Sequence, residues 1–529
     1  MSIVNNQNGE GKVVLAEIGK LKREVTLLPL FGLIYFTVCG GAFGAEAIIG
    51  FSGPGLAIAL FFLVPLVYSI PNMLMVRELQ SMMPGEGGYY HWVKQAFGPF
   101  AGFMAGWMNW VVSWVDVSIY PVLAAYYIGY FFPAIREGLQ IGNLFIDSNI
   151  LSLIIALILI WSISYLNVRG ARIAGLVTNW LGIFMVIPLI IISILGIYQW
   201  IRGGVTVSLP FIPEGQNIFG ALSTGIFVAM WNFMGWELPS AAGDEIVNPR
   251  RTYPMAMLLV LIAAIATYLL PTLAGLYGGA GEDGKYQLWG IEESASGEGI
   301  APAMEDYGIS ADKLQSWGVD PTSSVGWEFN DIAHAIGEKI SGKDSPLPWI
   351  LGGMVTISAV LGMIGLFIGN SLGGTRVPFA MAEDGMMPRW MVKVHGRYGT
   401  PWVSIVFCAI LYSIFSYSAF AVLVVIDVFM NVVVLLMQFL ALWKLRLARP
   451  DIKRWKIPGG WAGLTIITLG PFLIFFLAVY SQFQEEGFNS LGLALVAIVV
   501  GMLVYFPVRR YIKPGVPDID PFELETETD

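Results

Sequence analysis

The chain has 529 residues, of which 56% are hydrophobic and only 13% are charged. A typical soluble domain carries about 25% charged residues, and a soluble chain of this length would form about three domains, each with its own polar surface. The composition therefore excludes a soluble enzyme, a nucleic-acid binder and a disordered scaffold, and it predicts an integral membrane protein.

The net charge of −9 is concentrated in one segment. Residues 278–345 hold 13 acidic and 4 basic residues, so the rest of the chain is close to neutral. No block of basic residues favours nucleic acid as a partner. The two cysteines lie in apolar runs and the three histidines are scattered. We therefore expect no disulfide framework, no metal site and no cofactor.

Apolar runs long enough to cross a bilayer recur along the whole chain. A transmembrane helix needs about 20 such residues, and the predicted fold is all-α, membrane-embedded, with about twelve spans. The spans are predicted at residues 27–51, 55–78, 100–132, 148–168, 172–201, 217–246, 254–277, 348–384, 401–418, 420–446, 461–482 and 488–511.

Basic residues are concentrated in alternate connections between these spans. The positive-inside rule then predicts that residues 1–26 and 512–529 are cytoplasmic and that the acidic loop at 278–347 faces outward. Residues 27–446 form the predicted transport core and 461–511 two further helices. We interpret the loop as an ordered cap with a solvated acidic surface, and a cation-attracting vestibule is the alternative.

Two spans are interrupted near their middle. The first contains Gly40, Gly41 and Gly44, and glycine in a helix interior costs about 1 kcal/mol per residue. The sixth contains Gly235 and Pro239. Interruptions at corresponding positions of two halves indicate a transporter site at the interface of inverted repeats. Span 8 adds a stripe of glycines beginning at Gly362, which we expect to pack closely against a neighbouring span such as span 1.

Three connections resemble those of the amino acid–polyamine–organocation (APC) superfamily. They are MMPGEGGYYHWVKQAFGPFAGFMAGW, AAGDEIVNPRRTYPMAM and AMAEDGMMPRW…HGRYGTPWVSI. The segments GGAFGAEA, SWVDVSIYPVL, GLVTNWLGIFMVIPLI and MWNFMGWE are also similar to the plant-type branch of polyamine uptake transporters. The resemblance implies a LeuT-like fold of five helices plus five inverted helices, with two more at the end. The long acidic loop departs from the plant-type pattern, in which this connection is short.

Four acids lie inside predicted spans, at Glu46, Asp116, Glu237 and Asp427, with Arg376 as the one candidate basic partner. Ionisable groups in a membrane are costly and are functional by default. An excess of acids requires a cation, which a positively charged substrate or a proton would supply.

Glu46 follows the first break and is predicted to begin the second half of that span. Free backbone amides there form an anion site, and a carboxylate among them would repel a substrate carboxylate. This favours a substrate with amines and no carboxylate. The alternative is a glutamate that only caps its own helix.

On span 3, Asn109, Ser113, Asp116 and Tyr120 are spaced by four, three and four residues and share one helical face. We expect this polar face to line the transport pathway. Pairing of Asp116 with Arg376 or with a backbone group is the alternative.

Glu237 follows the second break and is flanked by Trp231 and Trp236. An acid beside aromatic rings suits an alkylamine because the ring face attracts cations, although each Trp could instead be core packing. Asp427 on span 10 is either a second amine or proton site or a structural polar contact.

We therefore predict a secondary active transporter of the plasma membrane that moves an organic amine by alternating access. A polyamine such as putrescine or spermidine is favoured, and an amino acid is the alternative substrate. Proton coupling through Glu46 or Glu237 is favoured over sodium or exchange. The predicted partners are the amine, the proton and the lipid bilayer.

Overall fold

The computed structural model describes most of the chain outside its two ends. The described residues are 26–83, 88–142, 144–169, 171–203, 210–213, 215–236, 249–292, 299–305, 308–383, 385–398, 400–418, 420–450, 454–487 and 489–509.

Within these residues, nine helical stretches are long and apolar enough to cross a membrane. This supports a multi-pass membrane protein, as the composition predicts. The stretches lie in α3 (Pro54–Val64) with η1 (Pro65–Ser69) and α4 (Ile70–Met82), α6 (Pro99–Ile128), α8 (Ser148–Arg169), α9 (Ala171–Ile201), α11 (Pro249–Gly275) with η3 (Leu276–Ala280), α15 (Leu347–Glu383), α17 (Phe420–Ala448), α18 (Gly460–Glu486) and α19 (Asn489–Arg509).

The predicted spans 27–51, 217–246 and 401–418 hold shorter helices. They contain α1 (Leu27–Val38), α2 (Glu46–Ser52), α10 (Ile218–Trp231) and α16 (Trp402–Phe415). A total of twelve spans requires each of these interrupted or short stretches to cross the bilayer as well. The total of twelve and the inverted repeat therefore stay predictions.

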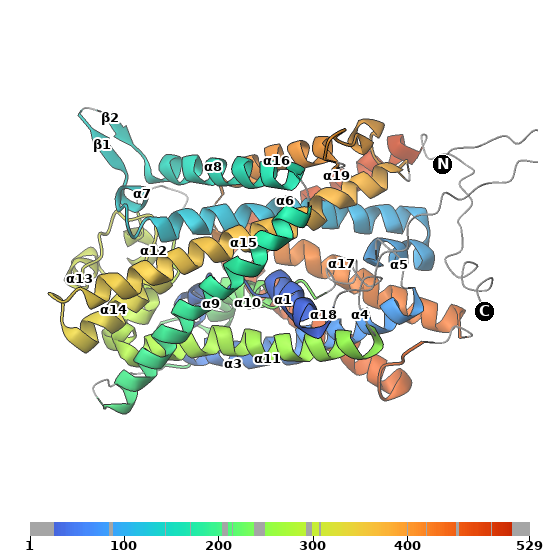
Figure 1. Cartoon of the computed structure of the whole chain (residues 1–529). Coiled ribbons are helices and arrows are strands. Elements are labelled where there is room, and N and C mark those ends of the chain that lie inside the picture. The colour runs from blue at the N-terminus through green and yellow to red at the C-terminus, as the bar shows by residue number, and fades with distance from the viewer. Residues whose placement is uncertain are drawn as a thin grey trace, which may run out of the picture.

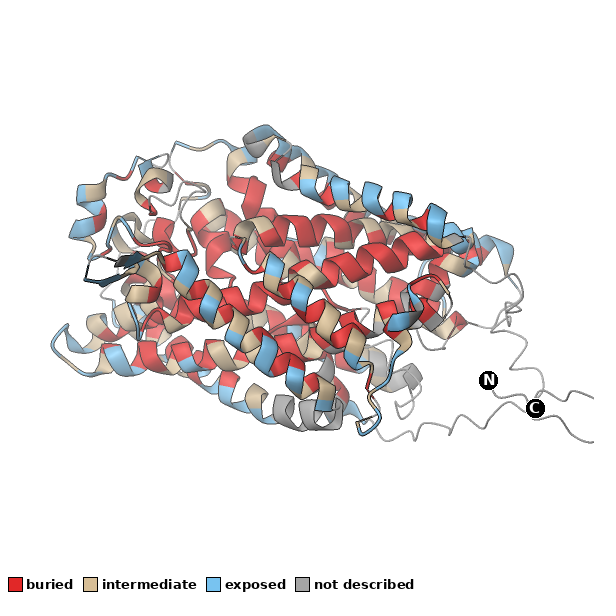
Figure 2. Cartoon of the chain, turned by 90° about the horizontal axis from the view of Figure 1, so that it is seen from above, coloured by how far each residue is buried: buried red, intermediate tan, exposed pale blue. Residues whose placement is uncertain are grey.

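Large apolar side chains cover the outside of the bundle. Ile194, Ile466 and Leu503 are more than 60% exposed, although each belongs to a strongly apolar helix. On the long helices, buried residues lie on the sides that face the centre of the bundle, and exposed residues recur on the sides that face outward (Figure 2). Hydrocarbon, rather than water, is the solvent in which such a surface is stable.

The remaining elements lie at the ends of the bundle. Figure 1 shows α7, the β-hairpin and helices α12 to α14 at one end, which we call the loop end. Strands β1 and β2 are antiparallel, with Gln140 opposite Phe145. The bounds are α5 (Gly88–Phe97), α7 (Ala134–Glu137), β1 (Leu139–Ile141), β2 (Leu144–Ile146), η4 (Glu282–Leu288), α12 (Ala301–Glu305), α13 (Ala311–Ser316), α14 (Phe329–Ser341) and η5 (Arg389–Val392).

Residues 278–347, which we call the loop region, form a small folded unit. Its apolar side chains gather in a separate cluster that includes Leu288, Ile300 and Leu314. Backbone hydrogen bonds join distant parts of it, because Gly290 N donates to Trp327 O and Trp327 N donates to Leu288 O. The described acidic residues of the loop region therefore belong to a folded unit at the loop end.

The first predicted break is present between α1 and α2. Gly41 and Gly44 have φ values of +105° and +84°, a left-handed backbone that favours glycine. The break leaves carbonyl groups without helical partners, and the Tyr268 hydroxyl donates to Val38 O at 3.4 Å. Helix α2 then begins at Glu46, as expected from the sequence.

The second break begins at the end of α10. Gly235 has a φ of +90°, and the nearby carbonyl of Phe233 accepts hydrogen bonds from Ser69 Oγ at 3.2 Å and Trp236 Nε1 at 2.7 Å. Two donors on one carbonyl stabilise backbone that no helix satisfies. Pro239 lies outside the described residues.

Gly362, the first glycine of the stripe on α15, packs against the first break. A side chain added at Gly362 would place its Cβ only 2.5 Å from the carbonyl oxygen of Gly40. The two backbones can therefore approach this closely only because position 362 is glycine. This contact fixes α15 beside the break and forms one wall of the interior.

Candidate functional site

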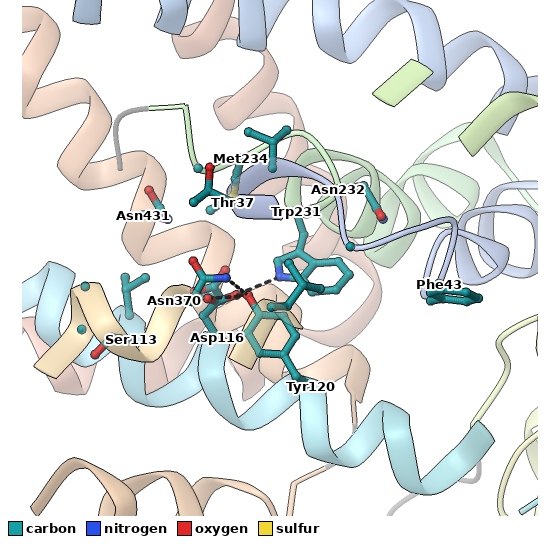
Figure 3. Close-up of a pocket in the computed structure, with 18 of the residues that line it drawn as sticks. Thr37, Phe43, Ser113, Asp116, Tyr120, Trp231, Asn232, Met234, Asn370 and Asn431 are labelled. Atoms are coloured by element: carbon teal, nitrogen blue, oxygen red, sulfur yellow. Dashed lines mark hydrogen bonds between the residues drawn. The ribbon is translucent and has the colours of Figure 1, made fainter. Parts of the chain in front are cut away.

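A cavity with about 70 Å³ of free space lies where the two breaks face α6, α15 and α17. Figure 3 shows side chains from these elements pointing toward one another across it. The lining residues are Thr37, Val38, Gly40, Gly41, Phe43, Asn109, Val112, Ser113, Asp116, Tyr120, Trp231, Asn232, Met234, Gly235, Tyr268, Leu366, Asn370, Gly373, Gly374, Asp427 and Asn431.

Asp116 is at the centre of a hydrogen-bond network in this cavity. Its carboxylate accepts from the Tyr120 hydroxyl at 2.7 and 2.8 Å and from Trp231 Nε1 at 3.2 Å. Asn370 Nδ2 donates in turn to the Tyr120 oxygen at 2.8 Å. The network, drawn in Figure 3, connects the carboxylate on α6 to Trp231 at the end of α10 and, through Tyr120, to Asn370 on α15. Its donors are neutral, so they orient the acid without balancing its charge.

The polar face predicted on span 3 lines the cavity. Asn109, Ser113, Asp116 and Tyr120 all belong to α6, and all four are lining residues. Asp427 adds a second carboxyl group from α17. The described lining residues thus include two acids and no Lys, Arg or His. A cavity of this composition attracts positive charge.

The other predicted site residues are placed differently. Gly44 lies beside the cavity, where an added Cβ would be 3.1 Å from the Trp231 ring. Glu46 and Trp236 are fully buried but are not among the lining residues. Trp236 instead supports the second break through Phe233. Glu237 lies outside the described residues, as does the side chain of Arg376.

The sequence interpretation missed several lining residues, among them Asn370 and Tyr268. Asn370 follows directly after Gly369 of the glycine stripe, and an amide within an apolar span is itself a signal that could have identified it. Tyr268 is an aromatic residue in an apolar helix, and nothing in its local sequence distinguishes it from core packing.

Glu46 belongs to a second polar cluster, nearer the loop end. Its carboxylate accepts a hydrogen bond from the Tyr127 hydroxyl of α6 and is in side-chain contact with Glu328 of the loop region. Arg136 lies near Glu328 and forms an ion pair with Asp331, at 2.8 Å between Nη1 and Oδ2. Glu46 is therefore not simply a cap on its own helix.

Glu292 ties the loop region to the start of α17. Its two carboxylate oxygens accept hydrogen bonds from the backbone amides of Phe420 at 3.1 Å and Ala421 at 3.2 Å. Burial is the main reason that the pKa of Glu292 is raised to about 7, and these two amide donors oppose the rise. Glu328 raises it further by repulsion.

A buried ion pair joins α4 and α17 away from the loop end. Arg446 Nη2 lies 2.6 Å from Glu78 Oε2, and Arg446 Nε donates to Glu78 Oε1 at 2.8 Å. Arg454 also approaches Glu78, at 3.4 Å. Glu78 is fully buried, so this pair locks the two helices through strong bidentate contacts.

Comparison with known proteins identifies a family match over most of the chain. The amino acid permease family matches residues 28–285 and 332–504. These segments include both breaks and every residue that lines the cavity. The gap at 286–331 falls in the loop region and contains Glu292 and Glu328.

Curated relatives cover nearly the full length of the chain. The polyamine transporter RMV1 of Arabidopsis thaliana is 29% identical over 497 residues, 93% of this chain and 87% of the relative. The polyamine transporter PUT1 of Oryza sativa subsp. japonica is 28% identical over 503 residues, 94% and 82% of the two chains. The serine/threonine exchanger SteT of Bacillus subtilis is 24% identical over 502 residues, 93% and 98%.

Proposed function

The chain belongs to the amino acid permease family, and we propose that it takes up a polyamine, such as putrescine or spermidine, by alternating access. The observation that carries the proposal is the pair of acids, Asp116 and Asp427, in a cavity whose described lining holds no basic side chain. Two buried carboxylates require positive charge from elsewhere, and an alkylamine supplies it.

The rest of the cavity suits an amine on an apolar chain. Trp231 and Tyr120 present aromatic surface beside Asp116, with ring centroids 6.4 Å apart. Aromatic faces attract ammonium groups by about 0.5–2 kcal/mol. Side-chain amides such as Asn370 and Asn431 provide oxygen acceptors for the remaining N–H groups of an amine.

The similarity to transporters named for polyamines agrees with this chemistry. The serine/threonine exchanger supports an amino acid as the second candidate substrate. A zwitterion would bring its own carboxylate close to Asp116, and the resulting repulsion is the reason that we prefer the polyamine.

We also propose that uptake is driven by protons, because the core offers buried carboxyl groups that can bind them. Glu46 and Glu237 are the candidates. We place the protein in the plasma membrane with both termini cytoplasmic and the loop end outside, following the distribution of basic residues.

Uptake into proteoliposomes tests the proposal. Labelled putrescine, spermidine, serine and threonine are each offered with and without an inward pH gradient, and with and without sodium. We expect saturable polyamine uptake that the pH gradient drives uphill in the absence of sodium. Saturable uptake of serine or threonine with no polyamine uptake would establish the amino acid alternative instead.

A further inference from the structure

The cluster around Glu46 is not needed to line the cavity, yet it buries a carboxyl group completely. Glu46 has no exposed surface, and its Oε2 atom has no hydrogen-bond donor among the described residues. The group that faces Glu46 is another carboxyl, that of Glu328. Two acceptors in contact cannot form a hydrogen bond unless one of them carries a proton.

Glu328 reaches this position from the loop region, directly before α14, and is only 3% exposed. Burial raises the pKa of Glu328 most, and repulsion from Asp331 adds to the rise. The contact with Glu46, the nearby Arg136 and the Tyr127 hydroxyl lower it.

The charged neighbours do not neutralise two ionised carboxylates. Arg136, the cation that acts on Glu328 among the described residues, already forms an ion pair with Asp331 at 2.8 Å. Glu292, whose carboxyl group is repelled by Glu328, supplies no positive charge either. Like charges in contact in a buried site favour the state in which one carboxyl is protonated.

The loop region also packs directly on α2. A Cβ added at Gly290 would be 2.5 Å from Cα of Ala47, and a side chain at Gly50 would collide with the carbonyl oxygen of Trp289. The two backbones are therefore in contact within about one helical turn of Glu46. Any separation of the loop region from α2 must also separate Glu328 from Glu46.

The pair is one aromatic ring away from the cavity. Tyr127, which donates to Glu46, packs edge-on against Phe43 with ring centroids 5.2 Å apart and planes at 78°. Phe43 is a lining residue of the cavity. A change at the acid pair can thus reach the cavity wall through two side chains.

We propose that Glu46 and Glu328 share one proton and form a proton-binding site that exists only while the loop region is seated on α2. Seating the loop region takes up a proton from solution. Loss of that proton leaves two carboxylates that repel each other, and the repulsion releases the loop region from α2. In the context of the proposed amine uptake, this site makes closure of the loop end depend on external pH.

Infrared spectroscopy of the protein in lipid tests the shared proton without any substrate. A protonated carboxyl group has a C=O stretching band that an ionised carboxylate lacks. We expect wild type at neutral pH to show a band that shifts in frequency or disappears in both Glu46→Gln and Glu328→Gln, because each variant removes one of the two groups that hold the proton. Asp312→Asn, a matched change at an exposed loop acid, should leave the band as in wild type. A band that is unchanged in either glutamine variant would overturn the shared proton.

Hydrogen–deuterium exchange tests the link to loop seating. If release requires loss of one proton, the equilibrium for opening rises tenfold per pH unit between the ordinary glutamate pKa and the pKa of the seated pair, and it levels off above the latter, after correction for intrinsic exchange. This slope should appear in peptides covering 46–52 and 327–332, and it should be absent from Glu328→Gln. A wild-type slope of zero contradicts the proposal.

Tyr127→Phe provides a second variant if the glutamine variants fold poorly. It removes a donor to ionised Glu46 but keeps both acids, so the infrared band should persist to higher pH than in wild type. A band that is lost at lower pH contradicts the shared proton. The infrared and exchange measurements are both made without substrate, so they test the shared proton independently of transport. If wild type transports no amine, that result counts only against the proposed function.

Discussion

Replacing Asp116 by asparagine removes a charge from the cavity while preserving its shape. In the wild-type protein, the Tyr120 hydroxyl and Trp231 Nε1 contact the carboxylate at 2.7–2.8 Å and 3.2 Å, respectively. The asparagine oxygen can still accept hydrogen bonds from both. The hydrogen-bond network, including Asn370, therefore has no reason to collapse. The change isolates the electrostatic attraction between the acid and an ammonium group.

The expected loss follows from the interaction that disappears. A hydrogen bond to a charged group contributes about 1.5–3 kcal/mol, which corresponds to roughly 10- to 150-fold in a dissociation constant. Asp427 remains in the cavity, so binding of a diamine should be weakened and not abolished. A monoamine, which depends on one acid only, should lose more of its total affinity.

The assay is equilibrium binding of labelled putrescine to purified protein in lipid, with Ser113→Ala as a control that changes a neutral lining residue. We expect the dissociation constant to rise by the stated factor in Asp116→Asn and by much less in the control. An unchanged constant in Asp116→Asn would show that the acid does not contact the amine, and the argument from cavity charge would fail.

Three further predictions concern stability. Because the pKa of Glu292 is raised, its neutral form is favoured in the folded state. The contribution of this group to the free energy of unfolding is full below the ordinary glutamate pKa and is lost as the pH rises through about 7. The wild-type melting temperature should fall across that interval more than in Glu292→Gln; equal slopes contradict the assignment. Glu78→Ala leaves Arg446 buried without its carboxylate partner and should lower the free energy of unfolding by about 3–5 kcal/mol. The melting temperature should therefore fall much more than in Asp312→Asn, and equal decreases in the two variants would refute the prediction. Gly44→Ala places a side chain on backbone with a φ of +84° and puts its Cβ 3.1 Å from the Trp231 ring. The resulting strain of about 1–3 kcal/mol should lower both the melting temperature and the uptake rate. If neither changes, the backbone at the break relaxes without cost.

Hydropathy and helical spacing predict the features that depend on local sequence. The break at Gly40–Gly44 was predictable because three glycines within five residues of one span destabilise its helix, and such interruptions are typical of transporter sites built from repeats. The polar face of Asn109, Ser113, Asp116 and Tyr120 was predictable because a regular helix fixes which residues share a side. Both features are present in the structure, and together they supply much of the cavity wall.

Features that depend on contacts between distant segments were not predictable in this way. Glu46 was expected beside the substrate because it follows the break, but Phe43 occupies the cavity wall and Glu46 lies among the loop-end acids. Its contact with Glu328 depends on how the loop region folds. The same holds for Glu78 and Arg446, which come from helices far apart in the chain.

The size of the cavity has a consequence for which amines this conformation can enclose. A water molecule needs about 10–15 Å³ of such space, so 70 Å³ accommodates only a handful of solvent molecules. A four-carbon diamine has about as many non-hydrogen atoms as this space holds water molecules, whereas a longer polyamine has more. Enclosing spermidine therefore requires the indole of Trp231 or the phenol of Tyr120 to move aside. The positions of these two rings then limit the chain length of the amine that this conformation can enclose.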